Sequence, residues 1–271
     1  MAGGLNVPRD AAAEIVRRLR EAGHEAFWVG GCVRDLIRGA APEDYDIVTS
    51  ARPEDVRGLF PRTIPVGERF GICLVVEGGA PYEVATFRTE ADYDDGRRPS
   101  RIAFATAEED VRRRDFTING LLMDPETGRI IDHVGGLRDI EQRIIRTIGD
   151  PEERFAEDHL RMLRAVRFAA TLGFSIEPMT FAAVRRRAGA STVLLSAESM
   201  YLGRFPATAR PEPGAADLSR HEAFVARLRA LFAEDPPAIR LILRRRDSFA
   251  VSLYHQIIQS DGYSAPFDTF L

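Results

Sequence analysis

Residues 30–46 constrain this chain most, because they join a glycine pair to two closely spaced carboxylates. Asp44 and Asp46 stand two positions apart at the start of an apolar run. A β-strand projects residues i and i+2 to the same side, so we expect both carboxylates to face one way. Gly30 and Gly31 open a short helix, where backbone N–H groups approach a phosphate closely. Oxygen ligands for Mg²⁺ beside donors for a triphosphate indicate phosphoryl or nucleotidyl transfer.

Composition indicates a soluble globular protein of one large or two ordinary domains, with 271 residues, 45% hydrophobic and 29% charged. No apolar run approaches the roughly 18 residues of a membrane span, so we expect no membrane association. Arginines interrupt the N-terminal helix, which argues against a signal peptide. Cys32 and Cys73 form neither a disulfide framework nor a metal-ligand pattern, which predicts a reducing, cytoplasmic location. No obligatory protein partner is evident.

The net charge of −4 argues against a nucleic-acid binder on average, but the charge is unevenly distributed. Residues 156–190 hold six arginines against three acidic residues. The chain contains no lysine. Every contact with a phosphate therefore has to come from arginine, from the backbone or from a metal ion.

Hydrophobic periodicity and turn residues predict a mixed α/β part followed by helices. We expect helices near 10–22, 33–38, 53–60, 107–113 and 136–143, and strands at 27–29, 45–48, 70–77, 82–87 and in a hairpin over 121–131. Residues 89–100 carry charge and turn formers, which predicts a mobile loop. One helix is expected from 152 to Gly173, a second from Pro178, and another over 221–232.

The domain prediction follows from this change from mixed helices and strands to helices alone. We expect a catalytic head over 1–150, an all-helical neck over 151–199, and an atypical C-terminal region over 200–271 with an uncertain role in RNA binding. Within the last region, residues 203–217 are rich in Pro, Gly and Ala and read as a linker.

At this point the chain resembles the bacterial class II tRNA nucleotidyltransferase and poly(A) polymerase family, a branch of the polymerase-β-like nucleotidyltransferases. The resemblance rests on five motifs in the family's order and spacing, over residues 25 to about 180. They are Gly30-Gly31-Cys32-Val33-Arg34-Asp35, Asp44-Tyr45-Asp46, Glu83-Val84-Ala85-Thr86-Phe87-Arg88, Arg113-Arg114-Asp115-Phe116-Thr117-Ile118-Asn119-Gly120, and the stretch from Arg154 to Phe168. It implies an α/β (α+β) head with a mixed sheet, then an all-α neck.

The predicted metal site uses Asp44 and Asp46 as ligands of catalytic Mg²⁺, which activates the attacking 3′-hydroxyl and stabilises the leaving pyrophosphate. The resemblance puts the strand of Glu83 beside them, which makes Glu83 the candidate third acid. Arg34 lies one helical turn after the glycine pair and can fork onto phosphate oxygens.

The resemblance also implies a nucleotide-binding role for the segment 113–119. Arg114 would bind the nucleotide, Asp115 would lie near the ribose 2′-hydroxyl, and Asn119 would complete this part of the site. A surface charge cluster is the alternative interpretation.

Asp158 and Arg161 lie three positions apart, which on a helix places them on one face. An ordinary salt bridge is the alternative. In the family this pair reads the incoming base: a carboxylate accepts from an exocyclic amine and a guanidinium donates to an acceptor, which suits cytosine and adenine. Arg164 and Arg167 would lie near phosphate or base, or form a solvated stripe.

The resemblance implies transfer of CMP and AMP from CTP and ATP to an RNA 3′ end, with tRNA as the expected substrate. A poly(A) polymerase, an A-only or C-only enzyme and a small-molecule nucleotidyltransferase remain alternatives. A catalytically crippled RNA-binding remnant is another, because residues 196–199 read Ser-Ala-Glu-Ser where the family has an arginine in the fourth position. Residues 93–99 resemble the mobile loop of tRNA-type members, which favours tRNA.

Overall fold

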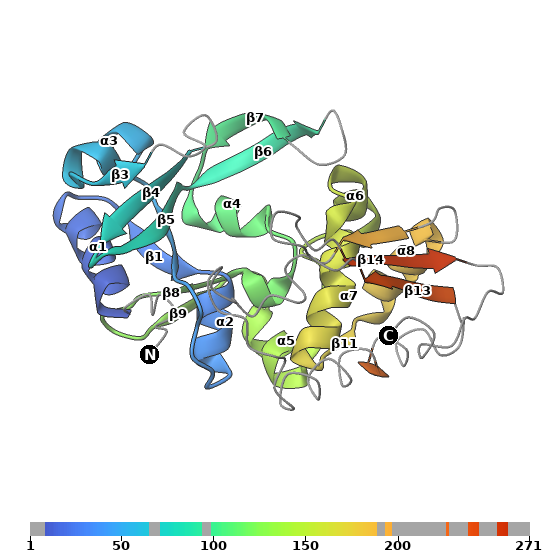
Figure 1. The fold of residues 1–271 in the computed structure, drawn as a ribbon. Helices are drawn as coiled ribbons and strands as arrows, with labels where there is room; N and C mark the ends of the chain where they lie inside the picture. Colours follow the sequence, from blue (N-terminus) through green and yellow to red (C-terminus); the bar gives the residue numbers. More distant parts are fainter. Residues whose placement is uncertain are drawn as a thin grey trace. The chain divides into compact units, whose positions relative to one another are not determined.

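The computed structural model describes residues 9–64, 71–93, 99–188, 193–196, 226–227, 238–243 and 254–259 (Figure 1). The chain divides into two compact units, Met1–Arg161 and Met162–Leu271. Helix α6 (Pro151–Glu157) belongs to the first unit. The division into a head over 1–150 and a neck over 151–199 stays a prediction.

A mixed sheet of seven strands, in the order β3-β4-β5-β2-β1-β8-β9, organises the first unit. Its central strands β1 (Ala26–Val29) and β2 (Asp46–Thr49) are antiparallel, whereas β2 and β5 (Ala80–Thr86) are parallel. The remaining strands are β3 (Thr63–Ile64), β4 (Ile72–Glu77), β8 (Leu121–Met123) and β9 (Ile130–Asp132). The mixed sheet predicted from the sequence is confirmed.

Short helices lie between these strands. They are α1 (Arg9–Glu21), α2 (Gly31–Ile37), α3 (Pro53–Leu59), α4 (Ala107–Arg112), the 3₁₀-helix η2 (Thr117–Asn119) and α5 (Gly136–Gln142), which β10 (Ile144–Ile145) follows. The apolar stripe of α1, including Ile15 and Leu19, is fully buried. Because that stripe repeats at helical spacing, burying it holds α1 in place. α1 packs near β1, β2 and β4.

One face of the sheet carries the residues that position the site. Val29 of β1, Val48 of β2, Ala85 of β5 and Val111 of α4 belong to one buried cluster. Side chains alternate along a strand, so Asp46, two residues before Val48, projects to this same face. The carboxylate therefore emerges where the apolar cluster ends.

The mobile loop expected over 89–100 is wrong for the part that the structure describes. Residues 88–93 form β6 (Arg88–Tyr93) and residues 99–104 form β7 (Pro99–Phe104), an antiparallel two-stranded ribbon (Figure 1). Such a ribbon needs no buried face along its length, so charged residues do not prevent it. Residues 94–98 lie outside the described residues.

The single helix expected from 152 to 173 is also wrong, because it breaks at Asp158. α6 ends at Glu157, Asp158 is extended with φ −141° and ψ 107°, and α7 (Leu160–Leu172) then begins. The Asp158 carboxylate accepts a hydrogen bond from the Leu160 N–H at 2.8 Å. An aspartate in this position satisfies an otherwise unpaired N–H of the new helix, which favours a restart over a continuous helix.

The second unit is not all-helical, contrary to the prediction for 151–199. After α7 come β11 (Ser175–Ile176), α8 (Pro178–Ala188) and β12 (Val193–Ser196). β12 forms a three-stranded sheet with β14 (Tyr254–Gln259) and β13 (Ala238–Leu243). The last two strands lie in the C-terminal region, where the sequence predicted no strand. The predicted linker at 203–217 lies outside the described residues, and of the helix expected over 221–232 only residues 226–227 are described, as helical. None of the described helices is both long and apolar enough to span a bilayer.

Candidate active site

Asp46 stands at the first position of β2, paired with Val29 of β1. Ile47 pairs with Val84 of β5, so the register sets Glu83, one residue earlier, beside Asp46. Asp46 is partly buried, whereas Asp44, just before the strand, and Glu83 are exposed. The three carboxylates predicted from the sequence therefore lie in one region, although Asp44 is outside the strand that was expected to hold it.

The electrostatics of Asp46 show how close these charges are. Burial, together with the charges of Glu83 and Asp44, raises the pKa of Asp46 to about 7, while Arg114 opposes the shift. The same cluster acts on Cys32, because burial and the charge of Asp46 raise the pKa of that thiol to about 12. A carboxylate held this way gains most from a bound cation.

The donor set suits a hard divalent cation bound by two carboxylates. Among the residues that the structure describes, no three His, Cys, Asp or Glu side chains gather closely enough to hold a metal ion. Mg²⁺ in proteins commonly uses one or two carboxylates, keeps several waters and takes substrate phosphate oxygens. Asp44 and Asp46 fit that requirement, whereas this geometry does not support Glu83 as a third direct ligand.

The turn at Gly30 brings the site together. Gly30 has φ 76° and ψ −129°, a conformation that is essentially restricted to glycine. A Cβ atom placed on it would lie 3.7 Å from Nη1 of Arg114, and 4.0 Å from both Oδ2 of Asp46 and the carbonyl oxygen of Asn119. The glycine motif, the carboxylate motif and the segment 113–119, which are separate in sequence, therefore meet at this turn.

The backbone N–H groups of Gly30 and Gly31 were both predicted to approach a phosphate, and they differ in this structure. The N–H of Gly30 donates to the carbonyl of Leu121 at 3.3 Å, which ties the turn to β8. That donor is therefore committed within the protein. Gly31 occupies the first position of α2, where the N–H has no carbonyl partner within the helix.

Arg34 holds other site residues in this structure. Its side chain is 10% exposed, and Nε and Nη2 fork onto the two oxygens of Asp35 at 2.9 Å each. Nη1 donates to Oδ1 of Asn119 at 2.9 Å, and Nδ2 of Asn119 donates to Asp115 at 3.1 Å. The fork predicted to grip phosphate is therefore engaged with Asp35, and Arg34 links α2 to η2.

Asp115 is buried and lies within η2's hydrogen-bond network. Its Oδ1 accepts from the Phe116 N–H at 2.8 Å as well as from Asn119. Its carbonyl oxygen accepts from the Ile148 N–H at 3.0 Å. Asp115, predicted to lie near a ribose hydroxyl, is thus held through both its side chain and its backbone carbonyl.

Asp110, which the sequence reasoning did not single out, holds the two arginines of the next motif. Its Oδ1 accepts from Nε and Nη2 of Arg113 at 3.0 and 2.7 Å, and its Oδ2 accepts from Nε and Nη2 of Arg114 at 3.2 and 2.9 Å. Burial opposes ionisation, but the charges of both arginines outweigh it and hold the pKa of Asp110 below its usual range.

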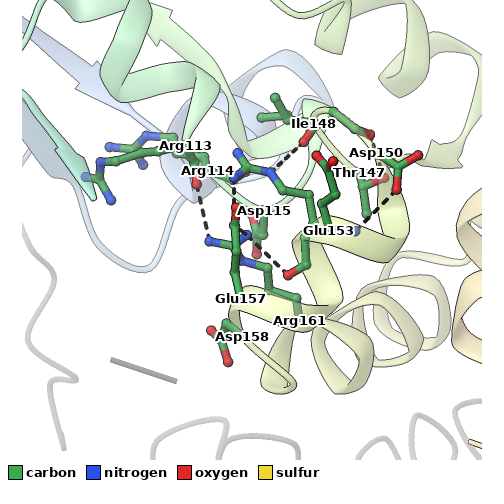
Figure 2. A network of polar contacts seen from close by, with 12 residues as sticks. Arg113, Arg114, Asp115, Thr147, Ile148, Asp150, Glu153, Glu157, Asp158 and Arg161 are labelled. Atoms are coloured by element: carbon green, nitrogen blue, oxygen red, sulfur yellow. Dashed lines mark hydrogen bonds and ion pairs between the residues drawn. The ribbon is translucent and has the colours of Figure 1, made fainter. Parts of the chain in front are cut away.

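Arg161 pairs with Glu157 and not with Asp158 (Figure 2). The side chain of Arg161 is 7% exposed, and its Nη1 donates to Oε2 of Glu157 at 2.6 Å. Glu157 also accepts from Nη1 of Arg154 at 2.7 Å, and Nη2 of Arg161 donates to the carbonyl of Arg113 at 3.4 Å. Arg161 is therefore a buried link between α7 and the segment that follows α4.

Asp158 points away from this network (Figure 2). One of its oxygens caps α7, and its backbone carbonyl accepts from the Arg161 N–H at 3.1 Å. The two residues remain neighbours, but through an N-terminal cap instead of a shared helical face. The salt bridge considered as the alternative is not formed in this structure.

Arg164 and Arg167 lie in the second unit. Both guanidinium groups lie over the ring of Phe168, at 5.2 and 4.8 Å from its centroid. Cations in this position are attracted by the face of the ring. A role for either arginine at the nucleotide stays a prediction.

The residues missed by the sequence reasoning carry a local signal. Asp110 precedes Arg113 and Arg114 by three and four positions, and Glu157 precedes Arg161 by four. These spacings favour ion pairs on helices. Spacing alone does not reveal that each acid pairs with both arginines at once.

The sequence and the fold both match known proteins. Residues 26–146 match the family model described as the poly A polymerase head domain. The CCA-adding enzyme of Geobacillus kaustophilus (strain HTA426) is 47% identical over 214 residues, which are 76% of this chain and 53% of that protein. The CCA-adding enzyme of Bacillus cytotoxicus is 52% identical over 176 residues, 65% of this chain and 44% of that protein.

Solved structures agree with these relatives. The crystal structure of the Bacillus stearothermophilus CCA-adding enzyme in complex with CTP matches with a TM-score of 0.66 and 40% identity, over 84% of this chain and 52% of that chain. The chain spans about half the length of the curated relatives that it matches. Four of the five motifs lie within the matched head domain, and the chain belongs to the tRNA nucleotidyltransferase and poly(A) polymerase family.

Proposed function

We propose that this chain is an RNA 3′-end nucleotidyltransferase that adds CMP and AMP from CTP and ATP, with tRNA as its substrate and a CCA end as its product. The observation that carries the proposal is the meeting of Gly30, Asp46, Arg114 and Asn119 at one turn. The names of its relatives support it, since the solved structure of the Bacillus stearothermophilus protein that this chain matches is a CCA-adding enzyme in complex with CTP. A further structure, 25% identical with a TM-score of 0.57, is described as a tRNA nucleotidyltransferase with a primer tRNA and an incoming ATP analogue.

Asp44 and Asp46 are the proposed ligands of Mg²⁺, with Glu83 as a neighbouring negative charge. When bound, the cation supplies a Lewis acid for the phosphate and lowers the pKa of the attacking hydroxyl. Arg114 contributes a positive charge to the phosphates from the other side of the Gly30 turn. Asn119 and Asp115 hold the sugar side of the site.

Asp158 and Arg161 are the proposed base-reading groups. The second oxygen of Asp158 makes no hydrogen bond within the described part of the chain, so it can accept from an exocyclic amine. Cytosine and adenine offer an amine beside a ring acceptor, whereas uracil and guanine place a carbonyl there. A buried mismatch of this kind costs a few kcal/mol, about 1–3. We place the reaction in the cytoplasm, where the buried thiols of Cys32 and Cys73 would stay reduced.

The test is a nucleotide-addition assay. The purified chain receives tRNA lacking its terminal CCA, Mg²⁺ and each labelled nucleoside triphosphate, singly and in pairs. Addition of C and then A supports the proposal; only A, only C or long A tracts would replace it with one of the relatives. No transfer of any nucleotide would overturn it.

Two variants link the assay to the site. Asp44→Ala should abolish transfer, while Glu108→Ala, which removes an exposed carboxylate paired only on the surface with Arg112, should leave it unchanged. Asp158→Ala should raise incorporation of U and G relative to C and A. Survival of activity in Asp44→Ala would contradict the metal assignment, and unchanged selectivity in Asp158→Ala would contradict the base-reading role.

A further inference from the structure

Asp110 connects three parts of the first unit from one buried point. Its side chain belongs to α4, is 1% exposed, and holds Arg113 with one oxygen and Arg114 with the other. The first oxygen also accepts from the backbone N–H of Arg88, where the β6–β7 ribbon begins, at 3.2 Å. We propose that Asp110 is a positioning residue that fixes the Arg114 guanidinium so that its remaining nitrogen, Nη1, meets the phosphates of the bound nucleotide.

The geometry of Arg114 is the first step of the argument. A guanidinium is planar and rigid, so fixing two of its nitrogens fixes the third. Asp110 takes Nε and Nη2 of Arg114, and Nη1 makes no hydrogen bond within the described residues. That nitrogen lies 3.7 Å from the Cβ position of Gly30, which is itself 4.0 Å from Oδ2 of Asp46. Nη1 is thus aimed at the turn on which we propose that the phosphates bind.

The charges are the second step. A buried carboxylate is costly unless it is paired and fully hydrogen-bonded, and Asp110 receives five hydrogen bonds from Arg88, Arg113 and Arg114. It therefore stays ionised and serves as the counter-ion of Arg114. Without it, Arg114 would be left to interact with Asp46, the proposed cation ligand, whose pKa its charge already lowers. Asp110 keeps the positive and the negative groups of the site apart.

This inference rests on the proposed function for the identity of the ligand, but its test needs no nucleotide transfer. The probe is sodium tripolyphosphate in the presence of Mg²⁺, titrated calorimetrically into the full chain. Asp110→Asn should weaken binding by about tenfold to hundredfold, because the amide no longer balances both arginines. The matched control is Glu108→Gln, an exposed acid of the same helix whose loss should change binding by less than about twofold.

A mutant cycle separates positioning from general loss of structure. In an Arg114→Gln background, Asp110→Asn should weaken binding by less than about threefold further, because residues that act as one unit are not additive. The full effect of Asp110→Asn persisting in that background would overturn the proposal, as would tripolyphosphate binding unchanged in a folded Asp110→Asn variant.

A third variant decides the case if Asp110→Asn does not fold. Arg114→Lys keeps the positive charge and an ion pair with Asp110, but a single ammonium cannot face Asp110 and the Gly30 turn at once. It should therefore bind tripolyphosphate at least about tenfold more weakly, and equal binding would refute the positioning role. A chain that binds tripolyphosphate in this pattern yet transfers no nucleotide would overturn the proposed function and leave the role of Asp110 standing.

Discussion

Asp46→Asn should stabilise the metal-free protein above neutral pH, although it removes a proposed metal ligand. Burial, Glu83 and Asp44 raise the pKa of Asp46 from 3.8 to about 7. For a carboxyl whose pKa is raised on folding, the native state binds protons more tightly than the unfolded state. The free energy of unfolding is therefore lowered as pH rises from 3.8 through about 7, and no penalty remains below 3.8.

The magnitude follows from the size of the shift. Roughly 3 pKa units at ~1.36 kcal/mol each give a penalty of about 4 kcal/mol at pH ~8, and only ~1.5 kcal/mol remains at pH ~5. Partial exposure of Asp46 reduces this to about 2–4 kcal/mol at the higher pH. For a unit of this size, such a change raises the melting temperature by roughly 5–10 °C. The asparagine has the same shape but no charge to desolvate.

The assay is thermal unfolding with a chelator, for wild type and variant, between about pH 4 and pH 8. The difference in melting temperature should shrink steadily toward acid. Asp124→Asn is the matched control, and its effect has the opposite sign. Burial raises the pKa of Asp124, but hydrogen bonds, of which the one from Arg20 is the strongest, lower it overall. That variant should be less stable than wild type at neutral pH and converge with it in acid. No stabilisation by Asp46→Asn at pH ~8, or an equal one at pH ~5, would refute the reasoning.

Two further predictions concern residues that shape the site. Gly30→Ala should destabilise the protein by about 1–3 kcal/mol, since its φ of 76° and ψ of −129° are strained for alanine; urea unfolding measures this. Gly58→Ala is the control, because it lies in α3 with open space around it and should stabilise by ~0.5–1 kcal/mol. Glu157→Gln should lower stability by about 1.5–3 kcal/mol and raise incorporation of U and G, because it removes the charged partner of Arg161. Glu153→Gln, on the exposed side of the same helix, should do neither, and equal effects of the two variants would contradict the argument.

The sheet and the two motifs at its centre could be predicted because their signals are local. An apolar run ending in glycines marks the end of β1, and acids before an apolar run mark the start of β2. The break at Asp158 could not be predicted, because the apolar spacing of a helix continues across it. Only the cap hydrogen bond from the Leu160 N–H to Asp158 shows that the helix restarts. The β6–β7 ribbon was missed because its strands pair with each other and carry no apolar alternation.

The sequence motifs predict which residues come together at the Gly30 turn, but not the contacts that each of them makes. The motif residues Asp46, Gly30 and Arg114 do converge, yet the sequence assigned Arg34 to phosphate, whereas Asp35 and Asn119 engage it. Such pairings depend on which segments the fold brings together. A list of charged residues cannot rank the possible partners of an arginine.

The two acids that the sequence reasoning overlooked explain how so many charges coexist in one small region. Asp110 holds Arg113 and Arg114, and Glu157 holds Arg154 and Arg161. Each arginine pair thus has its own counter-ion, so none of them needs to neutralise Asp46. The pKa of Asp46 bears this out, since Arg114 is the weakest of the influences on it and the raising effects prevail. A carboxylate that its own fold compensates only in part is one whose charge is available to a bound metal ion, and this is the condition that the proposed chemistry requires.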